Sequence, residues 1–131
     1  MKGQVGQVEH RTENMHLMSL NPTVGFRCLH YSVTESSGFV ELTLIKRTKE
    51  DIEFGVRTIE ATAKAGEDFV AIDESIHMRY DEYEKTIRVK IIDDEGWEPD
   101  EDFYVEIYNI STQKRMPGDD TSCTITILDE D

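Results

Sequence analysis

Short stretches in which apolar and polar residues alternate dominate the chain from Val24 onward. A period of two puts apolar side chains on one face of a strand and polar side chains on the other. The alternating stretches are 29–33, 40–44, 54–58, 76–80, 87–91, 103–107 and 123–127, and no helical stretch interrupts them. The pattern predicts an all-β fold, a seven-stranded antiparallel β-sandwich of the immunoglobulin-like type.

The first 22 residues differ from the rest because they are polar and show no sustained periodicity. We therefore expect residues 1–22 to be a polar leader or linker and residues 23–131 to form the folded domain. The chain has 131 residues, of which 37% are hydrophobic, which suffices for one domain with a real core. No apolar stretch is long enough to span a bilayer.

Residues 93–102 carry seven carboxylates in ten positions and directly follow a predicted strand. Carboxylates at this density in a fixed loop must become protonated, turn away into solvent or share a cation. Ca²⁺ accepts six to eight oxygen ligands in flexible geometry and suits such a loop better than other common ions. The segment therefore indicates a calcium-binding module.

The direction of the strands predicts that further acids join this loop. If seven strands alternate in direction, the first, third, fifth and seventh all end at the same edge of the sandwich. These four ends carry Glu35, Asp68, the 93–102 segment and the 129–131 segment, whereas the opposite edge receives Lys46, Arg47, Lys49, Lys114 and Arg115. A single acidic run is ordinarily a solvated surface, but four converging segments favour a shared site.

The net charge of −14 restricts the partners of the domain. Nucleic acids and anionic membranes would repel it, so we expect no nucleic-acid partner and no direct membrane insertion. Cys28 is predicted to face outward and Cys123 inward, which makes a disulfide between them improbable. With no signal sequence visible, a reducing compartment is favoured.

Other kinds of site do not match the sequence. The twelfth position from Asp93 is Tyr104, where an EF-hand needs a bidentate Glu. The four histidines show no zinc-binding spacing. We do not expect an enzyme, because the chain has neither a Gly-x-Ser-x-Gly nucleophile elbow nor a Gly-rich phosphate loop.

Several segments resemble those of a known family. They are 34–38 (TESSG), 61–69 (ATAKAGEDF), 91–95 (IIDDE), 101–103 (EDF) and 126–131 (TILDED). In this order, from about Tyr31 to Asp131, they resemble the Calx-beta family, which occurs in the cytoplasmic loop of sodium/calcium exchangers and in some adhesion and matrix proteins. The resemblance implies a domain that binds several Ca²⁺ ions at one edge of a β-sandwich.

The resemblance also implies the metal ligands. The acids at matching positions are Glu35, Asp68, Asp93, Asp94, Glu98, Asp100, Glu101, Asp129, Glu130 and Asp131. The set looks more like the first than the second calcium-binding domain of an exchanger, because acids persist at Asp100 and Glu101. The sequence departs from the family pattern at Ala61, Lys64, Gly96, Pro99 and Glu130, which bears on ion number and affinity.

Three functions follow as hypotheses. The first is a cytoplasmic Ca²⁺ sensor, whose ions order the acidic edge and act on a following second Calx-beta domain and the membrane part of an exchanger. The second is an extracellular adhesion or matrix module that Ca²⁺ stiffens, for which millimolar affinity is typical. The third is an acidic docking domain that binds a basic partner without metal and is weakened by salt.

Overall fold

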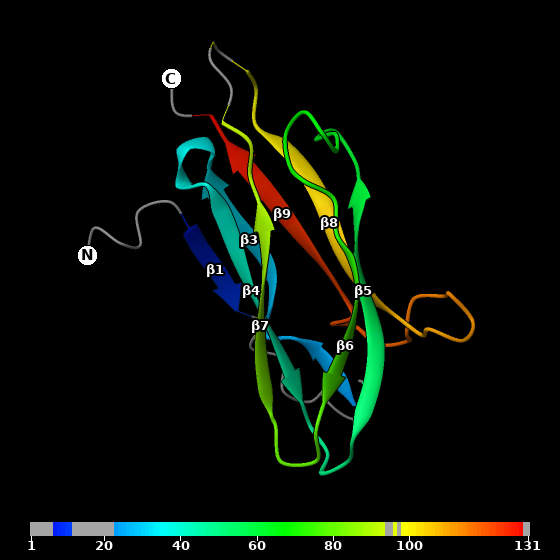
Figure 1. Cartoon of the computed structure of the whole chain (residues 1–131). Coiled ribbons are helices and arrows are strands. Elements are labelled where there is room, and N and C mark those ends of the chain that lie inside the picture. Colours follow the sequence, from blue (N-terminus) through cyan, green and yellow to red (C-terminus); the bar gives the residue numbers. More distant parts are fainter. Residues whose placement is uncertain (1–6, 12–22, 94–95, 97, 130–131) are drawn as a thin grey trace.

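The computed structural model describes residues 7–11, 23–93, 96 and 98–129, and within them the chain forms two β-sheets (Figure 1). The strands are β1 (Gln7–Arg11), β2 (Val24–Phe26), β3 (Cys28–Thr34), β4 (Phe39–Lys46), β5 (Ile52–Glu60), β6 (Asp73–Met78), β7 (Glu84–Lys90), β8 (Glu101–Tyr108) and β9 (Ser122–Leu128), with a short 3-10 helix at Glu35–Ser37. The seven predicted strands correspond to β3 to β9, so the predicted β-sandwich is confirmed.

One sheet has the strand order β1-β3-β9-β8-β5-β6 and the other has the order β2-β4-β7. Neighbouring strands are antiparallel with one exception, since β3 and β9 pair in parallel. The parallel pair arises because β3 and β9 are both odd members of the alternating series and lie side by side in one sheet. None of the helical segments in the described residues has the length and apolarity needed to cross a membrane.

The strand β1 lies within the segment that the sequence analysis assigned to a leader. It pairs with β3, from Gln7 opposite Val33 to Arg11 opposite Cys28. The Gln7 side chain also bridges to the other sheet, donating from Nε2 to the Glu41 carbonyl at 3.0 Å and accepting from the Glu41 N–H at 3.1 Å. Residues 7–11 are therefore part of the sandwich, and hydrogen bonding to both sheets places them there.

The core lies between the two sheets and is built by the inward positions of the strands. Its largest fully buried side chains include Tyr31, Phe26, Phe54, Phe69, Phe103 and Leu42. Cys28 is buried as well, contrary to the predicted outward direction, and it forms no disulfide with the buried Cys123. The β1–β3 register shifts beside Cys28, and this irregularity breaks the simple alternation on which the prediction rested.

The basic residues predicted at the edge opposite the acids are partly used inside the fold. Lys46 is only 4% exposed, and its Nζ donates to the carbonyls of Glu50 at 2.5 Å and Arg79 at 2.7 Å. Arg47 forms an ion pair with Asp120, whose side chain is buried. These two cations stabilise turns, and they do not form an open basic surface.

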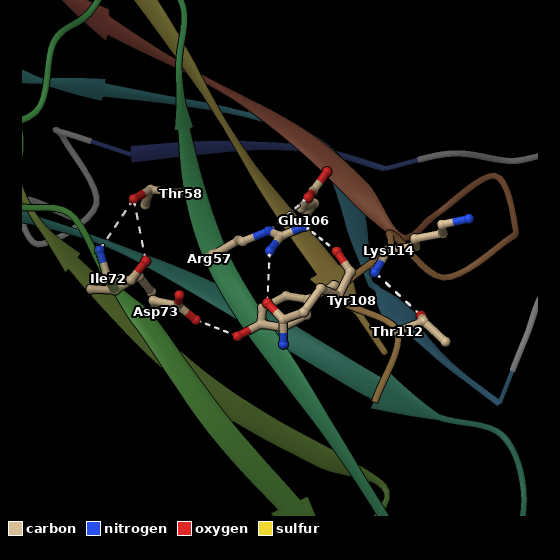
Figure 2. Close-up of polar contacts among 9 residues, drawn as sticks. Arg57, Thr58, Ile72, Asp73, Glu106, Tyr108, Thr112 and Lys114 are labelled. Atoms are coloured by element: carbon tan, nitrogen blue, oxygen red, sulfur yellow. Dashed lines mark hydrogen bonds and ion pairs between the residues drawn. The ribbon is translucent and has the colours of Figure 1, made fainter. Parts of the chain in front are cut away.

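A polar cluster on the outer face of the six-stranded sheet surrounds Tyr108 (Figure 2). Tyr108 pairs with Gly55, and a Cβ at Gly55 would lie 2.2 Å from the tyrosine ring, so the ring rests on the bare glycine backbone. The Arg57 guanidinium lies 4.0 Å from the ring centroid and donates to Glu106 at 2.9 Å. It also donates to the Gln113 carbonyl at 2.9 Å, which ties the β8–β9 loop to β5.

Candidate metal centre

The directions of four strands bring acidic segments to one edge of the sandwich, as predicted. β3 is parallel to β9, and β5 is antiparallel to β8, which is itself antiparallel to β9. The end of β7 joins them, because the Ile91 and Ile92 N–H groups donate to the carbonyls of Gly38 and Asp68, each at 3.0 Å. Figure 1 shows these strand ends in the upper part of the sandwich. We call this end the acidic edge.

Three carboxylates at the acidic edge form a compact cluster. Asp68, Glu98 and Glu101 are half-buried, and each offers a carboxylate oxygen within 4.8 Å of the others. Ligand oxygens around one Ca²⁺ ion lie at about 2.3–2.6 Å from it, so oxygens on opposite sides are about 5 Å apart. The cluster thus has dimensions that fit the coordination shell of a single ion. We call these three residues the carboxylate cluster.

The electrostatics of Glu101 reflect this crowding. Desolvation by burial raises the pKa of its carboxyl group, and the hydrogen bond to Asp68 and the charges of Asp68, Glu67 and Glu35 raise it further. Glu35 is 7% exposed and lies in the short helix after β3. Like charges held this close favour a bound proton or a bound cation.

The loop that carries Asp68 has a defined local structure. Gly66 adopts a φ of +89°, in the region that favours glycine, and its N–H donates to the Phe69 carbonyl at 2.8 Å. The Asp68 carboxylate accepts the Lys64 N–H at 2.8 Å, while the Asp68 N–H donates to the Lys64 carbonyl at 2.8 Å. Lys64 therefore helps to hold Asp68 through its backbone.

A second set of contacts connects the start of β8 to the end of β9. The Glu98 N–H donates to Asp129 Oδ2 at 3.3 Å, and the Asp129 N–H donates to Asp100 Oδ1 at 3.1 Å. These two bonds hold Asp129, the residue that follows β9, against the segment that precedes β8. Asp129 is half-buried and Asp100 is exposed.

The predicted ligands thus fall into three groups. The first group is connected at the acidic edge by hydrogen bonds, close carboxylate contacts and electrostatic interactions, and it consists of Glu35, Asp68, Glu98, Asp100, Glu101 and Asp129. Asp93 is exposed and directly follows Ile92, which is bonded to Asp68. Asp94, Glu130 and Asp131 lie outside the described residues.

The structure adds two acids that were absent from the predicted set. Glu67 acts electrostatically on Glu101, and its position beside Asp68 in the sequence is the signal that could have identified it. Asp102 accepts a hydrogen bond from Thr126 Oγ1 at 2.8 Å, and its N–H donates to Thr62 Oγ1 at 2.8 Å. Asp102 belongs to the acidic run, but only the folded structure shows these contacts to neighbouring segments.

The donors of the carboxylate cluster are all oxygens. Hard oxygen ligands suit Ca²⁺ and Mg²⁺, whereas softer ions favour nitrogen or sulfur ligands. Mg²⁺ requires nearly ideal octahedral geometry and keeps its water, whereas Ca²⁺ tolerates irregular sets of carboxylates from several loops. The arrangement from several separate segments therefore fits Ca²⁺ better.

Comparison with known proteins supports the same conclusion. The family model described as the Calx-beta domain matches residues 20–131. The chain belongs to the Calx-beta family. This Calx-beta domain is 30% identical over 139 residues to sodium/calcium exchanger 1 of Rattus norvegicus, a match that covers 90% of this chain and 14% of that protein. The chain thus spans about a seventh of the length of that curated relative.

Solved structures resemble the domain over most of its length. The structure described as the apo form of the Calx CBD1 domain has a TM-score of 0.72 and 28% sequence identity, and the match covers 82% of this chain and 96% of that one. The structure of the calcium binding domain CBD12 of CALX1.1 has a TM-score of 0.73 and 30% sequence identity, and the match covers 82% of this chain and 46% of that one. The resemblance to the first calcium-binding domain of an exchanger is confirmed.

Proposed function

We propose that this Calx-beta domain is a regulatory Ca²⁺ sensor, which binds several ions at the acidic edge and orders the segments that meet there. The observation that carries the proposal is the carboxylate cluster, in which Asp68, Glu98 and Glu101 bring ligand oxygens within 4.8 Å of one another. The similarity to CBD12 of CALX1.1, which is described as a calcium binding domain, supports it.

The predicted ligands would serve more than one ion. The carboxylate cluster supplies three of the six to eight oxygens that one Ca²⁺ ion needs, and Glu35 lies within electrostatic range of it. Asp93, Asp100 and Asp129 would contribute to neighbouring ions. The predicted ligands Asp94, Glu130 and Asp131 would complete those shells, since carboxylates from several loops can bridge adjacent Ca²⁺ ions.

Ion binding would act on the rest of a longer protein through the end of β9. Without ions, repulsion among the acids opposes close approach of their segments, and with ions the same charges attract a shared cation. Asp129 is already bonded to Glu98 and Asp100, so an ion there would fix the direction in which the chain leaves the sandwich. The adjoining partner we propose is a second Calx-beta domain, because the CBD12 structure covers about twice the length of this domain.

The wider context follows from the relatives. Since the chain is similar to part of sodium/calcium exchanger 1, we place the domain in a cytoplasmic loop of such an exchanger, where it passes Ca²⁺ occupancy to the membrane part. Sensors of this kind work at about 10⁻⁷–10⁻⁵ M Ca²⁺.

A calorimetric Ca²⁺ titration of the chelator-stripped domain, at physiological ionic strength and with millimolar Mg²⁺ present, tests the proposal. Several sites with micromolar or tighter affinity are expected. Millimolar affinity would instead favour the stiffened adhesion or matrix module. No heat, together with an unchanged melting temperature, would favour the metal-free docking domain, whose partner binding weakens steeply with salt.

Amide hydrogen exchange tests the ordering of the acidic edge separately from binding. Addition of Ca²⁺ should slow exchange in residues 64–70, 98–102 and 129. The β6–β7 turn at residues 79–83 serves as an internal control, because it lies at the opposite end of the strands. Unchanged exchange at the acidic edge in a domain that binds Ca²⁺ would contradict the ordering mechanism.

A further inference from the structure

Two aromatic rings stack in the core beside the carboxylate cluster. Phe69 and Phe103 have ring centroids 4.0 Å apart and planes inclined by 12°, and both side chains are fully buried. Phe69 lies in the β5–β6 connection and Phe103 lies in β8, so the stack joins two segments that are distant in the sequence.

Phe69 is linked to each of three acid-bearing segments. It directly follows Asp68, and its ring contacts Phe103, two residues after Glu101. Its backbone forms an antiparallel bridge to Ile91, two residues before Asp93. The flanking bonds from Ile92 N–H to the Asp68 carbonyl and from Val70 N–H to the Lys90 carbonyl, both 3.0 Å, hold this bridge on either side.

The hydrogen bond between Asp68 and Glu101 requires a proton on one of the two carboxyl groups, so it no longer holds this arrangement once both groups are ionised. Asp68 and Glu101 come from different segments and carry like charges, so in the absence of a cation they repel each other. The stacking of Phe69 on Phe103 supplies an attraction between the same two segments, and this attraction does not depend on the ion. Bonds from Ala63 N–H to the Asp102 carbonyl and from Asp102 N–H to Thr62 Oγ1, both 2.8 Å, brace the same two segments further from Asp68.

We infer that Phe69 and Phe103 are positioning residues for the metal centre, because their stack sets the separation of Asp68 from Glu101 before an ion binds. The inference rests on the proposed Ca²⁺ function and deepens it. A pre-arranged pair of ligands avoids part of the ordering that binding otherwise requires, so the stack raises Ca²⁺ affinity.

The test compares Ca²⁺ dissociation constants of the wild-type domain, Phe69→Leu, Phe103→Leu and the double variant. Leu keeps the position apolar but removes the flat ring. An aromatic pair contributes enough that each single variant should raise the dissociation constant by about twofold to tenfold. The double variant should show about the same rise as a single variant, because either change already removes the stack.

Phe54→Leu is the matched control. Phe54 is 1% exposed and lies in β5 six residues before Glu60, about 20 Å along the strand from the acidic edge. It should lower the melting temperature and leave the dissociation constant unchanged. All titrations are run well below the lowest melting temperature, so that global unfolding does not enter the affinity.

Phe69→Met and Phe103→Met replace any Leu variant that fails to fold, because the flexible thioether fills irregular space. The inference is overturned if the variants of the stack bind Ca²⁺ as tightly as the wild type, or if Phe54→Leu weakens binding as much as they do. A wild-type domain that binds no Ca²⁺ would overturn the proposed function itself, so the two failures are distinguishable.

Discussion

Replacing Glu101 by Gln should stabilise the ion-free domain and weaken its response to Ca²⁺. The Glu101 carboxylate has ligand oxygens of Asp68 and Glu98 within 4.8 Å. Two unit charges at that distance repel by about 1 kcal/mol in bulk water and by about 3.5 kcal/mol at an effective dielectric constant of 20. The site is half-buried and screened by salt, so we expect a gain of about 1–3 kcal/mol when this charge is removed.

Thermal unfolding in chelator and in saturating Ca²⁺ measures both effects. For a domain of this size, about 1–3 kcal/mol raises the melting temperature by several degrees. The ion-free variant should therefore melt above the wild type, while Ca²⁺ should raise its melting temperature by less, because one ligand oxygen has lost its charge. Glu53→Gln is the matched control, since Glu53 is exposed in β5 and should change stability by less than about 0.5 kcal/mol.

The pH dependence gives an independent check. The pKa of Glu101 is raised above its ordinary value of 4.5, so its protonation favours the folded state. That contribution is complete below pH 4.5 and is lost as the pH rises through the raised pKa. In chelator, the wild type should lose stability relative to Glu101→Gln over this interval. An ion-free variant that melts below the wild type, or an undiminished Ca²⁺ response, would refute the repulsion argument.

Three further substitutions test the framework by urea unfolding. Gly55→Ala places a Cβ 2.2 Å from the Tyr108 ring and should cost about 1–3 kcal/mol, whereas a gain would contradict the close packing. Lys46→Met removes the buried donor that bonds the carbonyls of Glu50 and Arg79 and should cost about 1–3 kcal/mol, so a neutral result would show that these bonds contribute little. Tyr108→Phe removes the hydrogen bond that the Tyr108 O–H donates to Asp73. This bond raises the pKa of Tyr108 above its ordinary value of 10, so the stabilisation from the bond is complete below pH 10 and is lost as the pH rises through the raised pKa. The variant should be less stable than the wild type at pH 8 and equally stable at alkaline pH, and a constant difference would exclude this hydrogen bond as the cause.

The acidic edge could be predicted from the sequence because it depends on strand direction alone. Alternating directions send every odd strand to the same end, whichever sheet each strand joins, and so Glu35, Asp68 and Asp129 converge. The pattern also identified β3 to β9, whose apolar positions face a common core. The strands follow from local alternation of apolar and polar residues, and the acidic edge follows from counting the strands in order.

Other features depend on contacts that periodicity does not encode. The strand β1 is placed by backbone pairing and by the bonds of Gln7, with no apolar alternation to reveal it. Cys28 is buried where the register of β1 with β3 shifts. The stack of Phe69 on Phe103 joins segments 34 positions apart in the numbering, and only the packed core brings the two rings together.

The antiparallel pairing of β1 with β3 has a mechanical consequence. Gln7 lies opposite Val33, close to the acidic edge, and β9 ends at the same edge before Asp129. Tension applied through chain segments on both sides would pull Gln7 away from β3 and break the β1 pairs one after another, as a zipper opens. Such a geometry yields at lower force than strands sheared along their length, so β1 would detach first and the remaining sandwich would stay intact.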